Sequence, residues 1–239
     1  MKQLRRFNEN FSYERYLLTI EEVLECIDTA VAEGTSYSLA RFGHAEIAEL
    51  QVFPDLYWGM EYYRKYNGVT RGNLKIELME AFKSCTTAGI LPTLEDASGA
   101  EYSRQTFLSL GLEFYTICSA WATHHMVRLP YFWDWVRPYR LVLVGRRAAE
   151  AAPIFASKGV AVVDAVMLSD YEQLEQVYQQ LCRVGGWNIA LIAAGVPATL
   201  LAPRLANATG KVAIDFGHAI DLIIDGEDFD FEGLVKKLR

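Results

Sequence analysis

The second half of the chain alternates continuous apolar runs with segments that have helical spacing. The apolar runs are rich in valine, isoleucine and leucine, and they stand at 141–144, 160–163, 188–193 and 211–214. Helix-like segments follow them at 146–159, 170–184 and from 195 onward. Buried runs that alternate with helices are typical of a parallel sheet covered on both faces. The pattern therefore predicts an α/β fold, with a Rossmann-like, mostly parallel sheet and helices on both faces.

The first half of the chain predicts further elements of the same kind. Thr19 caps a helix that ends at Gly34, and a short strand at 37–42 runs into Gly43, after which a helix begins at His44. Further along we expect a helix at 73–84, a strand at 89–92, a polar loop at 94–103, a long helix at about 103–127 and an aromatic turn or helix at 131–136. No repeat or linker interrupts the pattern. Residues 1–239 are predicted to form one domain with an aromatic, helical middle segment at about 53–138.

Composition narrows the class of function. The chain has 239 residues and a formal net charge of −7, which disfavours a nucleic-acid binder because such proteins need a basic face. The longest apolar stretch, 189–202, is broken by Gly195 and Pro197 and is too short to span a bilayer. The N-terminal residues lack the apolar core of a signal peptide, and the cysteines form no CxxC pair. We expect a cytoplasmic protein with no transmembrane segment and no nucleic-acid partner.

Glycine follows three of the predicted strands, at Gly145, Gly195 and Gly217, and a helix begins after each. Ligands of parallel sheets bind at the carboxyl ends of the strands, and a helix N-terminus that follows a glycine accommodates phosphate. Arg146 and Arg147 add positive charge there, which indicates a diphosphate site. Glycines that only form tight turns would give the same pattern. The GxGxxG fingerprint and the Walker lysine are absent, which disfavours dehydrogenases, P-loop NTPases and standard methyltransferases.

A second polar cluster, Arg41-Phe-Gly-His-Ala-Glu46, stands where the first long strand turns into a helix. An arginine makes bidentate contacts to phosphate, and ligands at positions 44 and 46 can converge on one cation or phosphate group. Alternatively, Glu46 only stabilises the first turn of the helix through the helix dipole. The cluster on its own leaves both interpretations open.

Other histidines and aromatic residues have less specific patterns. His218 follows a strand at the edge where ligands bind, and it is either catalytic or a supporting residue behind the site. His124 and His125 are adjacent on a predicted helix, so we expect a surface pair with one ring hydrogen-bonded inward. The aromatic residues at 57–66 and 131–139 are predicted to pack between helices rather than to stack on a ligand.

Two segments taken together resemble a known family. Ser38-Leu-Ala-Arg-Phe-Gly-His-Ala-Glu46 resembles the stretch of the GT-D-type glycosyltransferases in which "RxGDGE" carries a DxE motif. The segments 190–202 and 213–218 are similar to that family's strand–glycine–helix unit and its "DxGH" ending. The resemblance implies a single-domain sugar transferase that uses a nucleotide-diphosphate sugar, with a UDP-sugar as the expected donor. The implied acceptor is a glycan or a glycoprotein, and a homodimer is left open.

The resemblance also assigns residues. Arg41, Gly43 and Glu46 match the first motif, and Asp215, Gly217 and His218 match the second. The expected catalytic residues are Glu46, His44 and His218. Together with the phosphate features above, the expected nucleotide-sugar-binding residues are Arg41, Gly43, Gly145, Arg146, Gly195, Thr199, Asp215 and Gly217.

The sequence departs from the family at its most informative position, where His44 replaces the aspartate of the DxE motif. A carboxylate pair suits Mg²⁺ or Mn²⁺, whereas imidazole suits Mn²⁺ far better than Mg²⁺. Three interpretations follow: a Mn²⁺ site held by Glu46 and His44, a metal-independent site in which protonated His44 faces the diphosphate, or a protein that has lost activity.

These interpretations lead to different functions. In a transferase, Glu46 is the first candidate for metal ligand or general base, with Asp164 and Asp221 behind it. The alternative is a non-catalytic protein that binds a nucleotide sugar or a partner, with a degenerate DxE motif. A methyltransferase of Rossmann type would bind S-adenosylmethionine instead.

Overall fold

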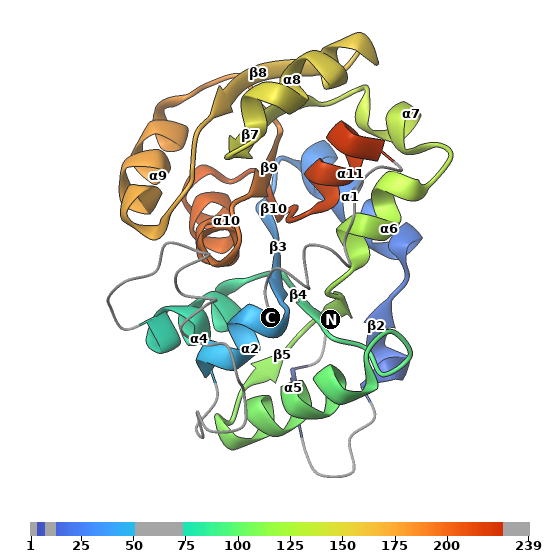
Figure 1. The fold of residues 1–239 in the computed structure, drawn as a ribbon, viewed down its shortest axis with the longest axis vertical. Coiled ribbons are helices and arrows are strands. Elements are labelled where there is room, and N and C mark those ends of the chain that lie inside the picture. The colour runs from blue at the N-terminus through green and yellow to red at the C-terminus, as the bar shows by residue number, and fades with distance from the viewer. Residues whose placement is uncertain (1–3, 8–12, 51–73, 227–239) are drawn as a thin grey trace.

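The computed structural model describes residues 4–7, 13–50 and 74–226, and an eight-stranded sheet crosses this part of the chain (Figure 1). The strand order is β2-β6-β4-β3-β10-β9-β7-β8, and every neighbouring pair is parallel. The strands are β2 (Leu17–Leu18), β3 (Tyr37–Phe42), β4 (Thr87–Ile90), β6 (Ile117–Ser119), β7 (Arg140–Gly145), β8 (Ala161–Val166), β9 (Ile189–Ala193) and β10 (Val212–Asp215). A separate antiparallel pair joins β1 (Arg5–Arg6) and β5 (Glu113–Phe114).

Helices cover the sheet on both sides, as Figure 1 shows. One face carries α1 (Ile20–Glu33), α6 (Ala122–Arg128), α7 (Phe132–Val136), α8 (Ala148–Ser157) and α11 (Ala219–Asp225). The other carries α2 (His44–Leu50), α4 (Leu74–Ser84), α5 (Ala97–Ser109), α9 (Leu174–Arg183) and α10 (Val196–Thr209). Two short 3-10 turns, η1 (Glu14–Tyr16) and η3 (Tyr171–Gln173), complete the described elements. The predicted fold class is confirmed.

Local sequence signals set the ends of the elements. The Thr19 hydroxyl accepts the Glu22 N–H at 3.2 Å while the Glu22 carboxylate accepts the Thr19 N–H at 2.8 Å, so α1 begins with a capping box. Gly34, with a φ of 64°, ends that helix in the left-handed region. These are the residues at which the sequence predicts the start and the end of the helix.

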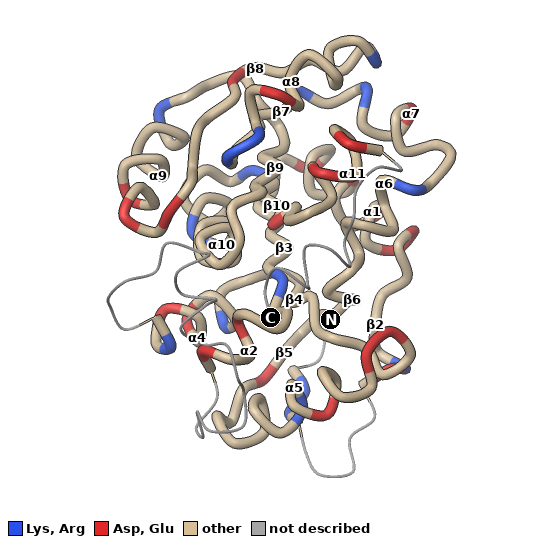
Figure 2. Tube along the Cα trace, in the orientation of Figure 1, with Lys and Arg blue, Asp and Glu red and all other residues tan. Residues whose placement is uncertain are grey.

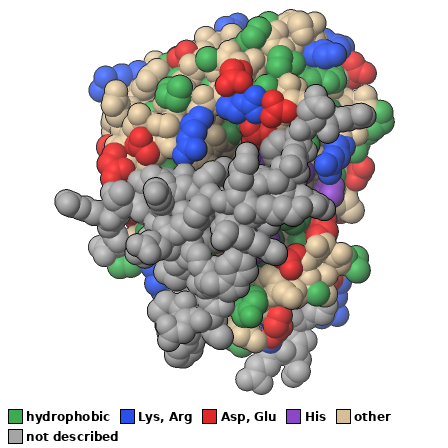
Figure 3. Space-filling view, in the orientation of Figure 1, with side chains coloured by type: hydrophobic (Ala, Val, Ile, Leu, Met, Phe, Trp, Pro, Cys, Tyr) green, Lys and Arg blue, Asp and Glu red, His purple; other side chains and the backbone are tan. Residues whose placement is uncertain are grey.

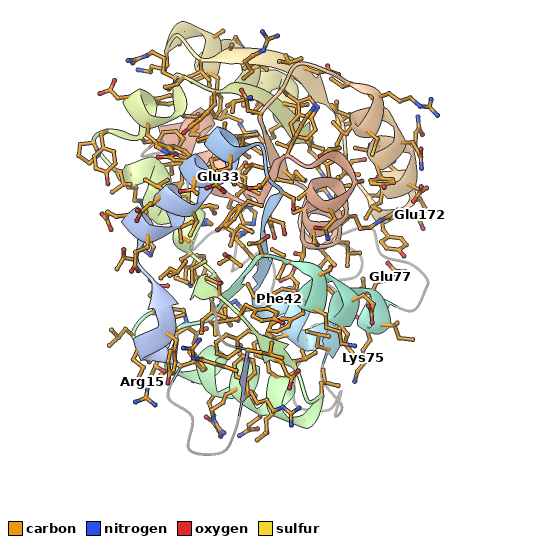
Figure 4. All side chains as sticks on the ribbon, turned by 180° about the vertical axis from the view of Figure 1, so that it is seen from behind. Arg15, Glu33, Phe42, Lys75, Glu77 and Glu172 are labelled. Atoms are coloured by element: carbon orange, nitrogen blue, oxygen red, sulfur yellow. The ribbon has the colours of Figure 1, made fainter. Side chains whose placement is uncertain are left out.

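The central strand β3 is buried on both faces. Phe42, at its carboxyl end, is fully buried and packs edge-on against Phe82 of α4, with ring centroids 4.8 Å apart. Figure 4 labels the buried Phe42 on β3, Lys75 and Glu77 on α4, and the exposed Glu33 at the end of α1. Leu39, on the opposite side of the strand, packs in the cluster formed with α1, α6 and α8. β3 therefore packs against both helical layers.

The expected loop at 94–103 and the expected long helix at 103–127 are wrong. The Asp96 carboxylate accepts the Gly99 N–H at 2.9 Å and starts α5 at Ala97. That helix ends at Ser109, and Gly111 follows with a φ of 61°, a conformation that favours glycine. The apolar run 117–119 then pairs with β2 and β4 as a strand. A short apolar run has no period of its own, so the neighbouring strand edges decided its structure.

Two other expectations concern the aromatic residues and the membrane. At 131–139 packing is confirmed: Trp133 contacts Phe155 edge-on at 5.3 Å, and the Trp135 indole N–H donates to Asp28 at 2.7 Å. The aromatic residues at 57–66 lie outside the described residues. Among the described helices, none has the length and apolar character needed to cross a bilayer.

Candidate functional site

The candidate site lies where the two central strands send their chains to opposite faces of the sheet. β3 and β10 are parallel neighbours, with Leu39 beside Ile214. After β3 the chain enters α2 on one face, and after β10 it enters α11 on the other (Figure 1). Adjacent strands that diverge in this way form a crevice at their carboxyl ends, which is the usual ligand position in open α/β sheets. Both segments of the predicted motif end at this crevice.

Arg41 and Asp215 join the two strands. The Arg41 guanidinium Nε donates to Asp215 Oδ1 at 3.2 Å, and the Arg41 backbone N–H donates to Oδ2 of the same carboxylate at 3.2 Å. The Arg41 Nη1 also donates to the carbonyl of Ala120, which follows β6. The guanidinium therefore connects three strand ends. A Cβ on Gly217 would lie 1.6 Å from Arg41 Nη2, so any larger residue at that position requires the guanidinium to move.

Glu46 and Thr199 extend this network into the protein. The Glu46 carboxylate accepts the Gly43 N–H at 3.0 Å, which closes the first turn of α2. The Thr199 hydroxyl lies 3.0 Å from Asp215 Oδ2, 3.3 Å from Glu46 Oε1 and 3.1 Å from the Arg41 carbonyl. A hydroxyl carries a single proton, so these three acceptors share it unless Glu46 itself is protonated and donates to Thr199. Thr199, predicted to bind the ligand, is fully buried behind Glu46 and Asp215.

Burial makes this network sensitive to proton uptake. Glu46 is 7% exposed, and burial together with the neighbouring Asp215 carboxylate raises the pKa of Glu46 to about 7. Burial also raises the pKa of Asp215, although the Arg41 guanidinium and the Thr199 hydroxyl act in the opposite direction. Two carboxylates and one guanidinium share a site of low polarity, so one proton taken up near neutral pH brings the cluster closer to charge balance.

His44 points to a different partner. Its Nε2 lies 2.6 Å from Asp96 Oδ2, at the start of α5. Partial burial acts to raise the pKa of Asp96, but hydrogen bonds from the Gly99 N–H and His44 outweigh it, so the pKa of Asp96 is below its ordinary value. The carboxylate only accepts, so Nε2 carries the proton and Nδ1 of the neutral ring keeps its lone pair. Within the described residues Nδ1 has no further hydrogen bond, and the side chain is 35% exposed.

Sequence reasoning did not identify Asp96 as a site residue. The only local signal is that aspartate is a common helix cap, and here the Asp96 carboxylate accepts the N–H of Gly99, three residues later. Nothing in the sequence places the β4–α5 connection beside the β3–α2 turn, because that requires the pairing of β3 with β4.

One interpretation of the first motif is a divalent cation held by His44 and Glu46. In the described part of the chain, no three His, Cys, Asp or Glu side chains are grouped so that they could hold a metal ion. His44 binds Asp96, and Glu46 binds Gly43 and Thr199, so their donor atoms do not form the expected pair. In this arrangement the two side chains do not offer a ligand pair to one cation, and a cation at that position stays a prediction.

Gly145 and Gly195, which belong to two of the predicted phosphate-binding turns, have different surroundings. Gly145 has a φ of 146°, and a Cβ there would lie 2.2 Å from the carbonyl of Ala193, so this glycine permits two strand ends to approach. Gly195 precedes α10, whose first turn includes Pro197, which has no N–H, and Ala198, whose N–H donates to Gly195. This helix N-terminus offers fewer open donors than the sequence suggested. The phosphate-binding role of both turns stays a prediction.

Arg146 and Arg147, which follow β7, bind different parts of the protein. Arg146 donates to the Ser169 carbonyl beyond β8, at 2.9 and 3.1 Å. Arg147 binds Asp221 at 2.9 Å and Asp225 at 2.6 Å on α11. Figure 3 shows basic and acidic side chains side by side on this face, over the start of α8 and over α11. The predicted positive field is therefore partly neutralised by the protein's own carboxylates.

The remaining predicted residues fall outside the Arg41 network. His218 Nδ1 lies 2.9 Å from Asp221 Oδ2, so this histidine belongs to the α11 ion-pair group. Asp164 lies on β8 at the edge of the sheet, where it accepts the Ala165 N–H. The expected surface pair of histidines with one ring hydrogen-bonded inward is wrong. The ring of His125 lies 2.8 Å from Glu95 near the surface, and the buried ring of His124 has no hydrogen bond.

A family model described as a GT-D fold-like domain matches residues 18–223. The chain belongs to the GT-D-like family. The match spans β2 to α11 and includes both segments that carry the motif resemblance. A search of curated proteins gave no match.

Solved structures agree with the family at the level of the fold. A structure of domain of unknown function 1792, described as a distinct glycosyltransferase fold, has a TM-score of 0.59 and 14% identity over 89% of this chain and 83% of its own. Its selenomethionine-substituted form gives a TM-score of 0.60 at the same identity and coverage. A protein from Streptococcus sanguinis described as a new glycosyltransferase gives 0.58 at 14% identity, over 89% of this chain and 86% of that one. At this identity the likeness shows the shared fold.

Proposed function

We propose that this GT-D-like protein is a glycosyltransferase that moves a sugar from a nucleotide-diphosphate sugar, with UDP as the nucleotide, to a hydroxyl of a glycan or glycoprotein. The observation that carries the proposal is the buried Arg41–Asp215–Thr199–Glu46 network at the crevice between β3 and β10. It joins the two motif segments that resemble the family. The similar structures, one described as a glycosyltransferase fold and one as a glycosyltransferase, support the same class of reaction.

In this proposal the donor diphosphate lies at the crevice beside Arg41. The Arg41 guanidinium is held by Asp215 and the Ala120 carbonyl, so Arg41 loses little side-chain freedom when a ligand binds. The fixed positive charge of this guanidinium stabilises the negative charge that builds on the leaving diphosphate. Arg146, Gly145 and Gly195 stand at the neighbouring strand ends and would extend the donor site in that direction.

The acceptor hydroxyl loses its proton to His44 in this proposal. The Asp96 carboxylate fixes the ring through Nε2 and leaves the Nδ1 lone pair open, which is the arrangement of an oriented general base. The hydroxyl oxygen forms a bond to the anomeric carbon as its proton passes to Nδ1. The bond from that carbon to the diphosphate breaks, and UDP leaves with the electron pair. Glu46 holds the turn that carries His44 by accepting the Gly43 N–H.

The test measures UDP binding and the hydrolysis or transfer of a panel of UDP-sugars by the wild type, His44→Gln, Glu46→Gln and the control Glu33→Gln. Glu33 is an exposed carboxylate at the end of α1 (Figure 4). We expect His44→Gln to bind UDP like the wild type and to lose at least tenfold in turnover. Glu33→Gln should be unchanged.

Each other outcome has a defined meaning. Loss of turnover in Glu46→Gln with unchanged turnover in His44→Gln assigns the proton transfer to Glu46. UDP binding by the wild type without turnover on any donor identifies a non-catalytic nucleotide-sugar-binding protein. Failure of the wild type to bind UDP or any UDP-sugar contradicts the proposed function.

A cation-dependent reaction is the alternative to His44 as general base, and it requires His44 and Glu46 to leave their present partners and bind one cation. In that case Mn²⁺ is favoured over Mg²⁺, because imidazole binds Mn²⁺ better than Mg²⁺. Measuring UDP binding with and without Mn²⁺, in the wild type and in His44→Gln, tests this. Mn²⁺ that strengthens UDP binding only in the wild type supports it.

A further inference from the structure

The imidazole of His124 is buried without a hydrogen-bond partner. The residue is 5% exposed, and neither Nδ1 nor Nε2 has a partner. Among the described residues, the hydroxyl of Thr116 is the other buried side-chain group in this condition. Leaving a buried polar group unpaired costs roughly 1–3 kcal/mol, and native proteins contain few such groups. Two unpaired atoms on one ring therefore call for a physical reason.

His124 lies in the first turn of α6, and residues next to it form hydrogen bonds with the candidate site. The carbonyl of Ala120, just before it, accepts the Arg41 guanidinium at 3.2 Å. The hydroxyl of Thr123, the preceding residue, donates to the Phe216 carbonyl in the connection from β10 to α11 at 3.1 Å. Trp121 packs edge-on against the imidazole with ring centroids 5.2 Å apart. His124 is thus fixed beside the crevice between β3 and β10.

The charge state of the ring limits what it can recognise. Burial, followed by the nearby positive charge of Arg41, lowers the pKa of His124 to about 2. A neutral imidazole presents one N–H donor and one acceptor nitrogen. It supplies no countercharge to a phosphate, a role that Arg41 already fills. A hydroxyl bonds either nitrogen, as donor to the acceptor nitrogen or as acceptor from the N–H, and the sugar is the part of a nucleotide sugar richest in hydroxyls.

We propose that His124 hydrogen-bonds a hydroxyl of the sugar moiety of the donor and so contributes to the choice of sugar. The inference rests on the proposed function and adds a residue that neither motif contains. A site built to bond a substrate hydroxyl discriminates strongly against a ligand that lacks it, because its own buried groups are then left unpaired. An ordered water molecule is the competing partner for the ring, and it predicts no effect of His124 on sugar binding.

The test compares His124→Phe with the adjacent control His125→Phe. Phenylalanine keeps a planar ring and removes both unpaired nitrogens, so we expect stability against denaturant equal to or above that of the wild type. His125 is 40% exposed in its side chain and is bonded to Glu95, away from the Arg41 network. Binding is measured by calorimetry with UDP, UDP-glucose, UDP-galactose and UDP-N-acetylglucosamine.

We expect His124→Phe to bind UDP with the wild-type Kd and to bind the preferred UDP-sugar at least tenfold more weakly, since one lost hydrogen-bonded contact corresponds to roughly that factor. His125→Phe should match the wild type for every ligand. If His124→Phe does not fold, His124→Gln, which keeps a donor and an acceptor, should retain part of the preference for the UDP-sugar over UDP.

Three results would overturn the inference. They are unchanged UDP-sugar binding in His124→Phe, an equal loss of UDP and UDP-sugar binding, and a wild type that binds UDP and all three UDP-sugars with one affinity. In each of these the wild type still binds UDP, so the proposed function survives. A wild type that binds none of the four ligands contradicts the proposed function instead.

Discussion

Glu46 is the residue whose chemistry depends most on its surroundings. In a solvated helix it would be an ordinary surface carboxylate, but here it is buried against Asp215 and Thr199, behind the turn that holds His44. The sequence identifies the residue through its motif. The raised pKa comes from burial and from a second carboxylate that is 169 positions away along the chain.

This environment predicts a pH dependence of stability. The pKa of Glu46 is about 7 in the folded protein and about 4.5 in an ordinary setting, so between these values the folded state binds more protons than the unfolded state. The free energy of unfolding should therefore fall as pH rises from 5 to 8, by about 2–3 kcal/mol from this residue. Glu46→Gln removes the titration and should flatten the dependence.

Urea denaturation of the wild type, Glu46→Gln and Glu33→Gln at pH 5 and pH 8 measures this effect. Glu33→Gln should follow the wild type, because that carboxylate is exposed. Parallel pH dependences for the wild type and Glu46→Gln would show that Glu46 keeps its ordinary pKa in the folded protein.

Asp96 has two separable roles, which makes it a useful position for substitution. It caps α5 through the Gly99 N–H and it binds His44. Asparagine caps helices about as well as aspartate, but it does not offer His44 a carboxylate. Asp96→Asn should leave stability within about 1 kcal/mol of the wild type and lower kcat for UDP-sugar turnover at least tenfold, with little change in KM.

The matched control for this prediction is Asp170→Asn. The Asp170 carboxylate caps η3 by accepting the Gln173 N–H, in the connection after β8 and away from His44. It should keep the wild-type kcat. Wild-type kcat in Asp96→Asn would remove the His44–Asp96 pair from the reaction.

At the scale of elements, the connections after β3 and β10 decide the geometry of the crevice. Arg41 lies on one strand and Gly217 follows the other, and the guanidinium passes over the glycine. Gly217 has a φ of 49°, so an alanine there combines backbone strain with a collision against Arg41. Gly210 also has a positive φ, 68°, at the end of α10, but a Cβ there meets no atom within 4 Å.

The pair Gly217→Ala and Gly210→Ala separates strain from collision. Gly210→Ala should cost about 1 kcal/mol of stability, from the backbone alone, and leave UDP binding unchanged. Gly217→Ala should cost more and weaken UDP binding at least tenfold, because the guanidinium is displaced. Equal stability losses with unchanged UDP binding in both variants would show that Arg41 moves aside without consequence.

At the scale of the whole molecule, one parallel sheet brings together residues that are far apart in the chain. Arg41 and Asp215 are separated by 174 positions, and they meet because β3 and β10 are neighbours at the centre of the sheet. Figure 2 shows acidic and basic residues interspersed along α4 and α5. The strand order therefore decides where the crevice lies, and the charge there comes from single residues such as Arg41 and Asp215.

The sequence by itself determined the α/β class, the parallel strands of the second half, the capping of α1 and the two motif segments at the carboxyl ends of β3 and β10. These follow from local periodicity and from turn chemistry, which act over a few residues. It was wrong for the loop at 94–103, where α5 begins, and for the unbroken helix at 103–127, which is interrupted by β5 and by β6 between β2 and β4.

The tertiary structure alone decided the partner of His44, the burial of Glu46 and the unpaired ring of His124. Each depends on which strand lies beside which, and hydrophobic periodicity does not encode that order. A hydrogen bond between residues 52 positions apart, such as that of His44 and Asp96, exists only after β3 and β4 have paired. The motif marks where the chemistry lies, and the packing of the sheet decides which atoms are available for it.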